Sequence, residues 1–556
     1  MSLLDVTVSD TRRFGGSARP ADSDARIALP CLLIFVATVL YLTALLPLGL
    51  NPYDEGVRLY GAERVLAGEL PYHDFFTYYA PGQFYWPAML FLLFGKQILV
   101  ARLGALLFVA IGAAAAFALC RRAGLDPLWS SLAAAALVLP IGNGSEFIIC
   151  DPSLALVLTA GAVLVGTAGA RSSHLVCGML IGLAGVFRHD FAAYGGTAAV
   201  LTAFWSGWRA HGHPEASSLA RARAAMGRLV PIFGGILLIA VPVYGLLGLR
   251  GPGVLVKALL LDPPAIMQFR ALPYSFELKR LYTSSVLLAT TMSPDAIPIV
   301  AQTAVIVTPV LALLLALALL LPSRRRSMPA RRTAGLLFLL VTASGLAVYA
   351  LGRSDWYHIY PLHVVAACVI TLVIAPDRTG ARSRSRLIEY AVAAVVAFVL
   401  VTTLATHVAL AASVRPLQLP RAAHVLVPER FLWIEGAVQD LWMVGDPGPI
   451  FVGAMRHDRV LANAVILYFL AERGSGTRFH AFDPAVTTRR DVQERIIEDL
   501  SKRKVRTAIV HTTGTVWDEP NKSRDSSEVF LLDQYLRAEF SALRETDPYL
   551  ILVRPR

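Results

Sequence analysis

The sequence predicts a polytopic α-helical membrane protein with about eleven transmembrane helices and a C-terminal extracytoplasmic α/β domain. Three observations predict this fold class. First, 56% of the 556 residues are hydrophobic and only 16% are charged, whereas soluble domains carry about 25% charged residues. Second, apolar stretches close to the length that crosses a bilayer recur up to residue 412. Third, residues 413–556 are polar and alternate between strand-like and helix-like patterns.

The membrane part is predicted to cover residues 27–412, after a polar N-terminal tail of residues 1–26. No small-residue cleavage site follows the first apolar run, so we interpret this run as a retained span. A short interfacial segment begins at Trp86. The predicted spans are Ile27–Leu50, Ile98–Cys120, Leu128–Ile141, Pro152–Ala170, His174–Phe187, Phe191–Trp208, Leu229–Leu249, Ile297–Leu321, Thr333–Leu351, Tyr357–Ile374 and Leu387–Ala412.

The charge pattern predicts the orientation of these spans. The formal net charge of +12 comes from short basic runs between apolar stretches, a pattern that indicates positive cytoplasmic loops and not nucleic-acid binding. Every second connection is basic if the N-terminus is cytoplasmic. These connections contain Arg121-Arg122, Arg171, Arg209 with Arg221, Arg223 and Arg228, Arg324–Arg326 with Arg331-Arg332, and Arg378 with Arg382, Arg384 and Arg386. An odd number of spans then places residues 413–556 outside, in the periplasm or extracellular space.

The C-terminal segment is predicted to form a mostly parallel sheet with helices on its faces, because strand and helix patterns alternate along it. It contains no cysteine, so it is not a disulfide scaffold. The expected strands are Pro449–Met455, Arg478–Phe482, Arg506–His511 and Tyr549–Val553. The expected helices are Ala464–Glu472, Thr488–Lys504 and Glu528–Phe540.

The first outer loop, residues 51–85, is the segment richest in candidate functional residues. Asp54 and Glu55 directly follow the first predicted span, where ionisable side chains are costly unless solvated, paired or used. A helix is expected over Glu55–Ala67. A structural role is the alternative for Asp54, since Asp commonly caps a helix.

Three further groups lie at predicted outer ends of spans. Asp151 precedes Pro152, which is also an ordinary helix start. The Arg188-His189-Asp190 cluster could be a solvated turn, or a phosphate site on the same side as Asp54. The third group, Arg353, Asp355 and His358, lies among aromatic residues that could simply form an interfacial belt, although Arg suits bidentate contact with phosphate.

The first outer loop resembles the GT-C superfamily of integral-membrane glycosyltransferases, with closest likeness to protein O-mannosyltransferases and lipid A aminoarabinose transferases. The likeness covers residues 1–200 well and the rest by topology only. The motifs that carry it are Asp54-Glu55, Gly68 to Pro71-Tyr72, Ala80-Pro81-Gly82, Phe94-Gly95 and Ala101-Arg102-Leu103. The aminoarabinose transferases have a Lys before a pair of prolines in this loop. Here Tyr79-Ala80 precede Pro81, and Gly82 replaces the second proline.

The resemblance implies sugar transfer, with inversion, from a polyprenyl-phosphate donor to a lipid or glycan acceptor at a bacterial inner membrane. A carboxylate can take the acceptor's proton and cations can neutralise the leaving phosphate. Asp54 is the expected general base. Glu55 is expected to orient Asp54, or alternatively to help hold a metal or the acceptor. The expected phosphate ligands are Arg353, Arg188, Arg58, His358 and His189. The expected acceptor or sugar contacts are Asp151, Tyr72, His73 and Asp355. No convincing set of metal ligands is found, and a divalent metal stays open.

Three alternatives remain. The first is a transporter or flippase, which the position of the charged candidates at span ends disfavours, because transporters place such residues near the bilayer midplane. The second is an envelope polysaccharide polymerase or ligase that uses Arg and His without a carboxylate base. The third is a non-catalytic assembly subunit with the same fold. Substitution of Asp54 separates the last two from the transferase.

Overall fold

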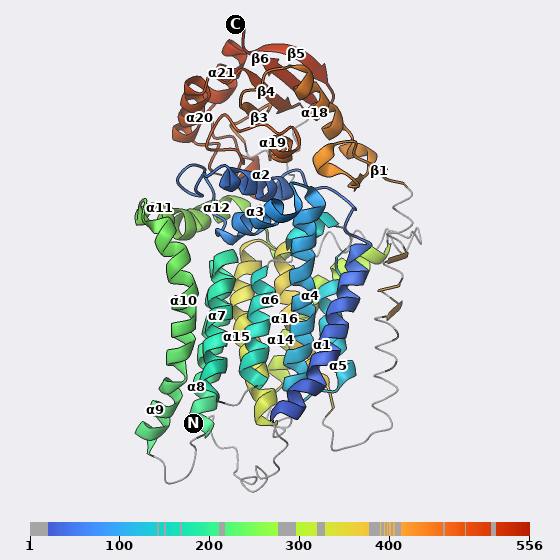
Figure 1. Ribbon diagram of the computed structural model, residues 1–556, viewed down its shortest axis with the longest axis vertical. Helices are drawn as coiled ribbons and strands as arrows, with labels where there is room; N and C mark the ends of the chain where they lie inside the picture. Colours follow the sequence, from blue (N-terminus) through green and yellow to red (C-terminus); the bar gives the residue numbers. More distant parts are fainter. Residues whose placement is uncertain are drawn as a thin grey trace.

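The computed structural model has three levels: a helical bundle, a layer of helices lying across one end of it, and a C-terminal unit above this layer (Figure 1). The structure describes residues 20–141, 144–149, 152–166, 169–210, 217–275, 296–319, 328–376, 413–459, 462–483, 485–512 and 519–555, with single positions between 390 and 405.

The bundle contains the apolar helices. They are α1 (Pro20–Thr43), α4 (Ile98–Arg122), α5 (Pro127–Val138), α6 (Pro152–Gly166), α7 (Arg171–Phe187), α8 (His189–Ala210), α10 (Leu229–Gly248), α14 (Ala296–Leu319), α15 (Ala330–Gly352) and α16 (Trp356–Ile374). Within the described residues, the helices long and apolar enough to cross a membrane are Arg26–Thr43, Ile98–Arg122, Ser218–Gly248, Ala330–Gly352 and Trp356–Ile374. The last predicted span, Leu387–Ala412, lies largely outside the described residues. The number of spans therefore stays a prediction.

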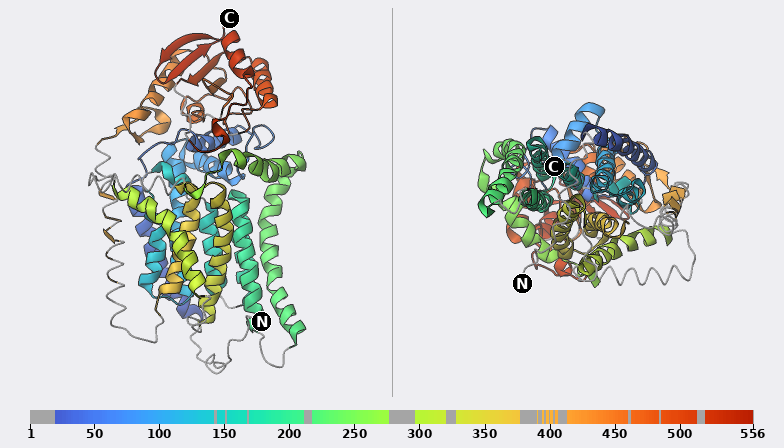
Figure 2. Two further views of the ribbon diagram at one scale, coloured as in Figure 1. Left: turned by 180° about the vertical axis from the view of Figure 1, so that it is seen from behind. Right: turned by 90° about the horizontal axis from the view of Figure 1, so that it is seen from below.

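Small residues let two bundle helices approach closely. A Cβ on Gly178 of α7 would lie 2.0 Å from the Ile232 carbonyl oxygen, and one on Gly235 of α10 would lie 2.3 Å from that of Leu175. Contacts of this kind are typical of helices that pack inside a membrane, where backbone approach replaces the hydrophobic effect. The view from behind shows the same side-by-side helices (Figure 2).

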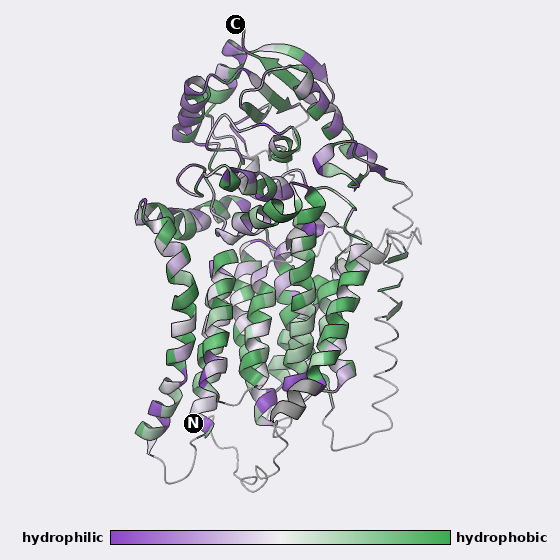
Figure 3. Ribbon diagram, viewed as in Figure 1, coloured by the Kyte–Doolittle hydropathy of each residue, from purple (hydrophilic) through white to green (hydrophobic). Residues whose placement is uncertain are grey.

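Hydrophobic residues predominate along the bundle helices, and hydrophilic residues are more frequent at the ends of the bundle (Figure 3). Leu40, Leu237 and Leu313 are large, apolar and exposed, which a lipid surrounding would satisfy. The short helix α9 (Ser218–Gly227), with Arg221 and Arg223, lies at the end of the bundle opposite the C-terminal unit. Helix α9 carries one of the basic runs that the charge pattern assigns to the cytoplasmic side, and the orientation itself stays a prediction.

The first helix ends earlier than predicted. Helix α1 stops at Thr43, not at Leu50, and the chain turns at residues 44–47. Gly49 adopts a φ of 78°, and its amide donates to the Leu426 carbonyl at 2.9 Å. Pro47 and Gly49 disfavour a continued helix, and the segment instead binds the start of the C-terminal unit.

The middle layer contains α2 (Asp54–Leu66), α3 (Gly82–Phe94), α11 (Pro252–Val256), a π-helical turn at Lys257–Leu261 and α12 (Asp262–Arg270). The expected helix in the first outer loop is α2, and the expected interfacial segment is α3. A Cβ on Gly56 would lie 2.3 Å from the Ile466 nitrogen, and one on Gly61 would lie 2.3 Å from Phe84 Cδ1. These glycines let α2 pack tightly against both the C-terminal unit and α3.

The C-terminal unit contains a four-stranded sheet of order β3–β4–β6–β5. Its strands are β3 (Ile450–Ala454), β4 (Thr507–His511), β5 (Ser541–Thr546) and β6 (Tyr549–Val553), and its helices are α18 (Trp433–Met443), α19 (Ile466–Leu470), α20 (Arg490–Lys502) and α21 (Leu531–Glu539). A separate antiparallel pair joins β1 (Arg415–Pro416) and β2 (Leu426–Val427). One hydrophobic cluster includes Val57 and Phe84 of the layer together with Ile466 and Phe469 of this unit, so the two parts share a core.

Two predictions about this sheet are wrong. Only β3 and β4 pair in parallel, because β6 runs antiparallel to both β4 and β5. The segment Arg478–Phe482 is not a strand. Its Arg478 carbonyl accepts from the Phe76 amide at 3.1 Å, and the Phe482 amide donates to Asn463 Oδ1 at 3.0 Å. These backbone groups therefore bind the first outer loop and a side chain rather than a neighbouring strand.

Candidate functional site

At the start of α2, whose N-cap residue is Tyr53, the side chain of Asn51 and not that of Asp54 accepts from the backbone amides. Asn51 Oδ1 accepts from the Asp54 amide at 2.9 Å and from the Tyr53 amide at 3.2 Å, which satisfies donors that a helix start leaves unpaired. Asn51 Nδ2 donates to Asp54 Oδ2 at 3.0 Å. Within the residues that the structure describes, Asp54 Oδ1 accepts no hydrogen bond. The alternative role of Asp54 as a helix cap is therefore wrong, and one of its carboxylate oxygens stays available.

Glu55, the second acidic residue, forms a buried ion pair with Arg102 of α4. Arg102 Nε donates to Glu55 Oε1 at 2.6 Å and Nη2 donates to Oε2 at 2.9 Å. Both residues are 3% exposed. The guanidinium also donates to the carbonyls of Leu46, Leu48 and Gly49. The pair thus joins α2, α4 and the segment that follows α1, and it holds the start of α2 at the end of the bundle.

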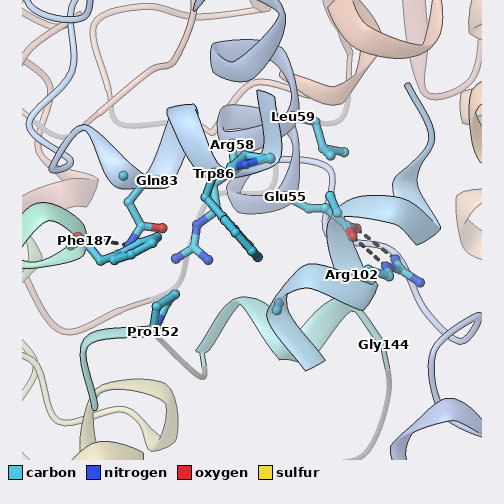
Figure 4. Close-up of a pocket in the computed structure, with 13 residues that line it drawn as sticks. Glu55, Arg58, Leu59, Gln83, Trp86, Arg102, Gly144, Pro152 and Phe187 are labelled. Carbon is cyan, nitrogen blue, oxygen red and sulfur yellow. Dashed lines mark hydrogen bonds and ion pairs between the residues drawn. The ribbon is translucent and has the colours of Figure 1, made fainter. Parts of the chain in front are cut away.

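Arg58 lies one turn after Asp54 and lines a pocket beneath α2. The pocket has a volume of about 60 Å³. Figure 4 shows the Arg58 guanidinium between Gln83, Trp86 and Pro152, on the far side of the pocket from the Glu55–Arg102 pair. No hydrogen-bond or ion-pair partner of Arg58 is found in the described part of the chain. Of the three arginines predicted to bind phosphate, this one has its guanidinium available.

A second carboxylate, Asp483 of the C-terminal unit, lies close to the start of α2. Its Oδ1 accepts from the hydroxyls of Tyr53, at 2.9 Å, and Tyr78, at 2.8 Å. Arg270 Nη1 donates to the Tyr78 hydroxyl at 3.0 Å. Burial raises the pKa of the Asp483 carboxyl above its ordinary value, Arg270 and the tyrosine hydroxyls oppose the shift, and the charge of Asp54 adds to it.

Arg353, the second predicted phosphate ligand, is already paired with two carboxylates. Its Nε donates to Asp355 Oδ2 at 2.6 Å, and its Nη1 donates to Glu519 Oε2 at 2.9 Å. Asp355 also caps α16 by accepting from the His358 amide at 2.9 Å, and it contacts His358 Nδ1 at 2.6 Å. These charged partners lower the pKa of the Asp355 carboxyl, although burial alone would raise it. Residues predicted to contact sugar and phosphate therefore form one buried network.

The third predicted arginine, Arg188, is also paired. It contacts Asp190 through Nε at 2.9 Å and donates from Nη1 to the Tyr349 hydroxyl at 3.0 Å. The Tyr349 and His358 rings lie 5.3 Å apart, so the Arg188 cluster and the Arg353 network are neighbours. His189 lies beside them at the start of α8, where it lines an apolar groove formed with α10 and α11.

Tyr72 and His73 attach the first outer loop to α10 and α11. Tyr72 is buried against Leu247 and Leu255, and its hydroxyl donates to the Tyr79 carbonyl at 2.8 Å. His73 Nε2 lies 3.2 Å from the Leu247 carbonyl oxygen. The structure therefore gives both residues contacts that support the fold, and their predicted contact with the acceptor stays untested.

Asp151 lies outside the described residues, although Pro152 beside it lines the Arg58 pocket. Among the described residues, no three His, Cys, Asp or Glu side chains lie close enough together to hold a metal ion.

Sequence reasoning missed five residues of this site. Tyr53, Tyr78 and Arg270 were visible as aromatic or basic positions in outer segments, but nothing in their spacing indicated a common partner. That partner, Asp483, follows Tyr53 by 430 positions. Glu519 likewise reaches Arg353 from 166 positions away. Contacts over such separations leave no periodic signal in a single sequence.

Comparison with known proteins supports the fold and provides no sequence-level match. No protein-family model and no curated protein matches the chain. Apo ArnT from Cupriavidus metallidurans is 15% identical, with a TM-score of 0.50 over 95% of this chain and 100% of that one. ArnT bound to undecaprenyl phosphate is 15% identical, with a TM-score of 0.44 over 94% and 99%. The mycobacterial arabinofuranosyltransferase AftD is 16% identical, with a TM-score of 0.48 over 94% of this chain and 41% of that one.

ArnT and AftD are GT-C membrane glycosyltransferases. At 15% identity, the match with apo ArnT concerns the fold alone. The structural match extends over nearly the whole chain, including the bundle, the layer and the C-terminal unit. The sequence motifs of the first outer loop carried the resemblance only for the N-terminal part. The chain is therefore a helical membrane protein with a GT-C-like fold.

Proposed function

We propose that this protein is a glycosyltransferase that takes a sugar from a polyprenyl-phosphate donor. It transfers the sugar to a cell-envelope acceptor, a lipid or a glycan, on the outer side of a bacterial inner membrane. The membrane domain would comprise residues 27–412, and its first outer loop, residues 51–85, would be the catalytic loop. Residues 413–556 would lie in the periplasm. The orientation rests on the distribution of arginines between the two ends of the bundle.

One observation carries this proposal: Asp54 and Arg58 lie one turn apart on α2. Residues four apart share a face of a helix. A carboxylate with one oxygen unengaged by the described residues and a guanidinium without a described partner are therefore held together at the boundary between bundle and C-terminal unit. The carboxylate suits the removal of a proton and the cation suits a phosphate. The motifs shared with GT-C transferases support the same assignment.

The proposed reaction needs both groups at once. The acceptor hydroxyl oxygen attacks the anomeric carbon of the donor, and its proton passes to Asp54 Oδ1. The bond between that carbon and the phosphate oxygen breaks, and the phosphate leaves on the polyprenyl carrier. Arg58 would neutralise the charge that develops on the phosphate. Glu55 would position Asp54 through its ion pair with Arg102.

The experiment measures sugar transfer in reconstituted membranes supplied with a panel of labelled polyprenyl-phosphate sugars. We expect transfer by the wild type and a loss of about a hundredfold or more in Asp54→Asn, because a positioned general base contributes about 10²–10⁴-fold. Asp74→Asn is the matched control, since Asp74 is an exposed carboxylate of the same loop that binds only the Leu70 amide and, at 3.9 Å, Arg250. It should transfer at the rate of the wild type.

Other outcomes would assign another function. Transfer that survives in Asp54→Asn at equal folded protein would favour a polymerase or ligase that uses Arg and His. Movement of lipid across the membrane, without transfer from any donor, would favour a transporter or flippase. A fully folded protein with neither activity would favour an assembly subunit.

A further inference from the structure

We infer that Asp483 of the C-terminal unit is a positioning residue for Asp54, so that this unit completes the candidate active site. The inference rests on the proposed function of Asp54 and names a residue that acts on it from outside the membrane domain. It is carried by hydrogen bonds that run from the sheet of the C-terminal unit to the first turn of α2.

The direct link is between Asp483 and the residue before Asp54. The Tyr53 hydroxyl donates to Asp483 Oδ1 at 2.9 Å and also lies 3.1 Å from the Phe482 carbonyl oxygen. Tyr53 is the N-cap residue of α2, and its own side chain makes no capping hydrogen bond. The direction of the first turn of α2, and with it the place of the Asp54 carboxylate, therefore depends on where Asp483 holds Tyr53.

The second link closes the loop around the same carboxylate. Tyr78, near the other end of the first outer loop, donates to the same oxygen, Asp483 Oδ1, at 2.8 Å. Arg270 of α12 donates to the Tyr78 hydroxyl. Asp483 is only 3% exposed, and a buried charge without partners would be costly. Because two tyrosines and a nearby arginine provide those partners, the Asp483 carboxylate fixes three segments of the membrane domain at one point.

Asp483 is itself held rigidly. Asn463, which is 1% exposed, donates from Nδ2 to the Val452 carbonyl of β3 and to the His480 carbonyl, both at 2.9 Å. Its Oδ1 accepts from the Phe482 amide at 3.0 Å. Asn463 thus ties the segment that ends at Asp483 to the central sheet. A fully satisfied buried amide of this kind specifies one arrangement of the backbone.

The consequence is a division of roles between the two acidic partners of the site. Glu55 fixes α2 to the bundle from below, whereas Asp483 fixes the start of α2 from above. Asp54 lies between these two attachments, at the point where a shift of about 1 Å can cost about a hundredfold in rate. The C-terminal unit therefore contributes to the chemistry by geometry, in addition to any contact with the acceptor.

The test compares transfer kinetics of the full-length wild type, Asp483→Ala, Asp483→Asn and Tyr53→Phe in reconstituted membranes. We expect Asp483→Ala to lower kcat about 10- to 100-fold, while binding of a polyprenyl-phosphate without sugar changes less than about threefold. Asp483→Asn keeps an oxygen that accepts from tyrosine hydroxyls, so it should restore most of kcat. Tyr53→Phe should lower kcat about tenfold.

Asp440→Ala is the matched control. Asp440 is also a buried carboxylate of the C-terminal unit that accepts from a tyrosine hydroxyl, that of Tyr549 at 2.8 Å, but it lies on α18 away from Asp54. This variant should lose thermal stability without a matching loss of kcat.

Three results would overturn the inference. Transfer by Asp483→Ala at the rate of the wild type would show that Asp54 needs no support from this unit. Equal losses of kcat in Asp440→Ala and Asp483→Ala, in proportion to stability, would reduce the role of Asp483 to folding. A wild type that transfers no sugar would instead remove the proposed function, and the inference with it.

Discussion

The two adjacent acidic residues of α2 should respond to substitution in opposite ways. We expect Glu55→Gln to destabilise the protein and, at equal folded protein, to lower transfer less than Asp54→Asn does, because Glu55 only positions Asp54; Asp54→Asn should leave the fold intact and remove transfer. The reason is that Glu55 is buried against Arg102 with both oxygens engaged, while one oxygen of Asp54 has no described partner.

The expected magnitude follows from the contacts of Arg102. Breaking a buried ion pair by removing one charge costs about 3–5 kcal/mol, because the other charge stays buried. Arg102 keeps its hydrogen bonds to the carbonyls of Leu46, Leu48 and Gly49 after Glu55→Gln. We therefore expect the lower end of that range, about 3 kcal/mol of unfolding free energy.

The assay is reversible unfolding by SDS in mixed micelles, followed by circular dichroism. Arg102→Gln should lower the free energy of unfolding more than Glu55→Gln does, since the three carbonyls lose their donor as well. The loss in the double variant should be about 2 kcal/mol smaller than the sum of the two single losses, as expected for directly interacting residues. Glu498→Gln, which breaks exposed pairs with Arg495 and Lys502, is the control and should change nothing measurable. Additive costs, or a Glu55→Gln variant of unchanged stability that transfers no sugar, would refute a structural role for Glu55.

Two further predictions concern the C-terminal unit. Arg353 contacts Glu519 through Nη1, so an incoming donor phosphate must displace this carboxylate. We therefore expect Glu519→Gln to tighten the binding of polyprenyl-phosphate about tenfold in a binding titration. Unchanged or weaker binding would argue against Arg353 as a phosphate ligand. Burial, and then the charge of Arg64, lower the pKa of His480 well below its ordinary value. The buried neutral His480 therefore stabilises the fold fully above about pH 6.5. Below this pH the unfolded state binds the proton more readily, so the free energy of unfolding falls by up to about 1.4 kcal/mol per pH unit until the folded-state pKa is reached. Thermal midpoints between pH 8 and 5 should therefore fall more steeply for the wild type than for His480→Gln, and parallel curves would contradict this reasoning.

The sequence by itself determined the features that depend on local composition. Apolar length and periodicity located the described bundle helices, because spans are recognised by hydropathy. A short pattern of apolar positions located α2, and a short apolar stretch located α3. The ordered motifs from Asp54 to Arg102 indicated the GT-C resemblance before any tertiary contact was considered. The predicted end of the first span was wrong. The Gly49 amide donates to the Leu426 carbonyl, and local sequence patterns do not reveal such a long-range contact.

Tertiary structure alone decided how the candidate residues are used. Asp54 and Glu55 are equivalent in sequence, and only the position of Arg102 on α4 separates a structural carboxylate from an available one. Arg58, Arg188 and Arg353 were all candidates for binding phosphate, but the structure places carboxylates beside Arg188 and Arg353. The parallel sheet was mispredicted because strand direction depends on pairing partners, which an alternating pattern does not specify. A single sequence encodes helix period and polarity locally, whereas the pairing of buried charges depends on which distant segments the fold brings together.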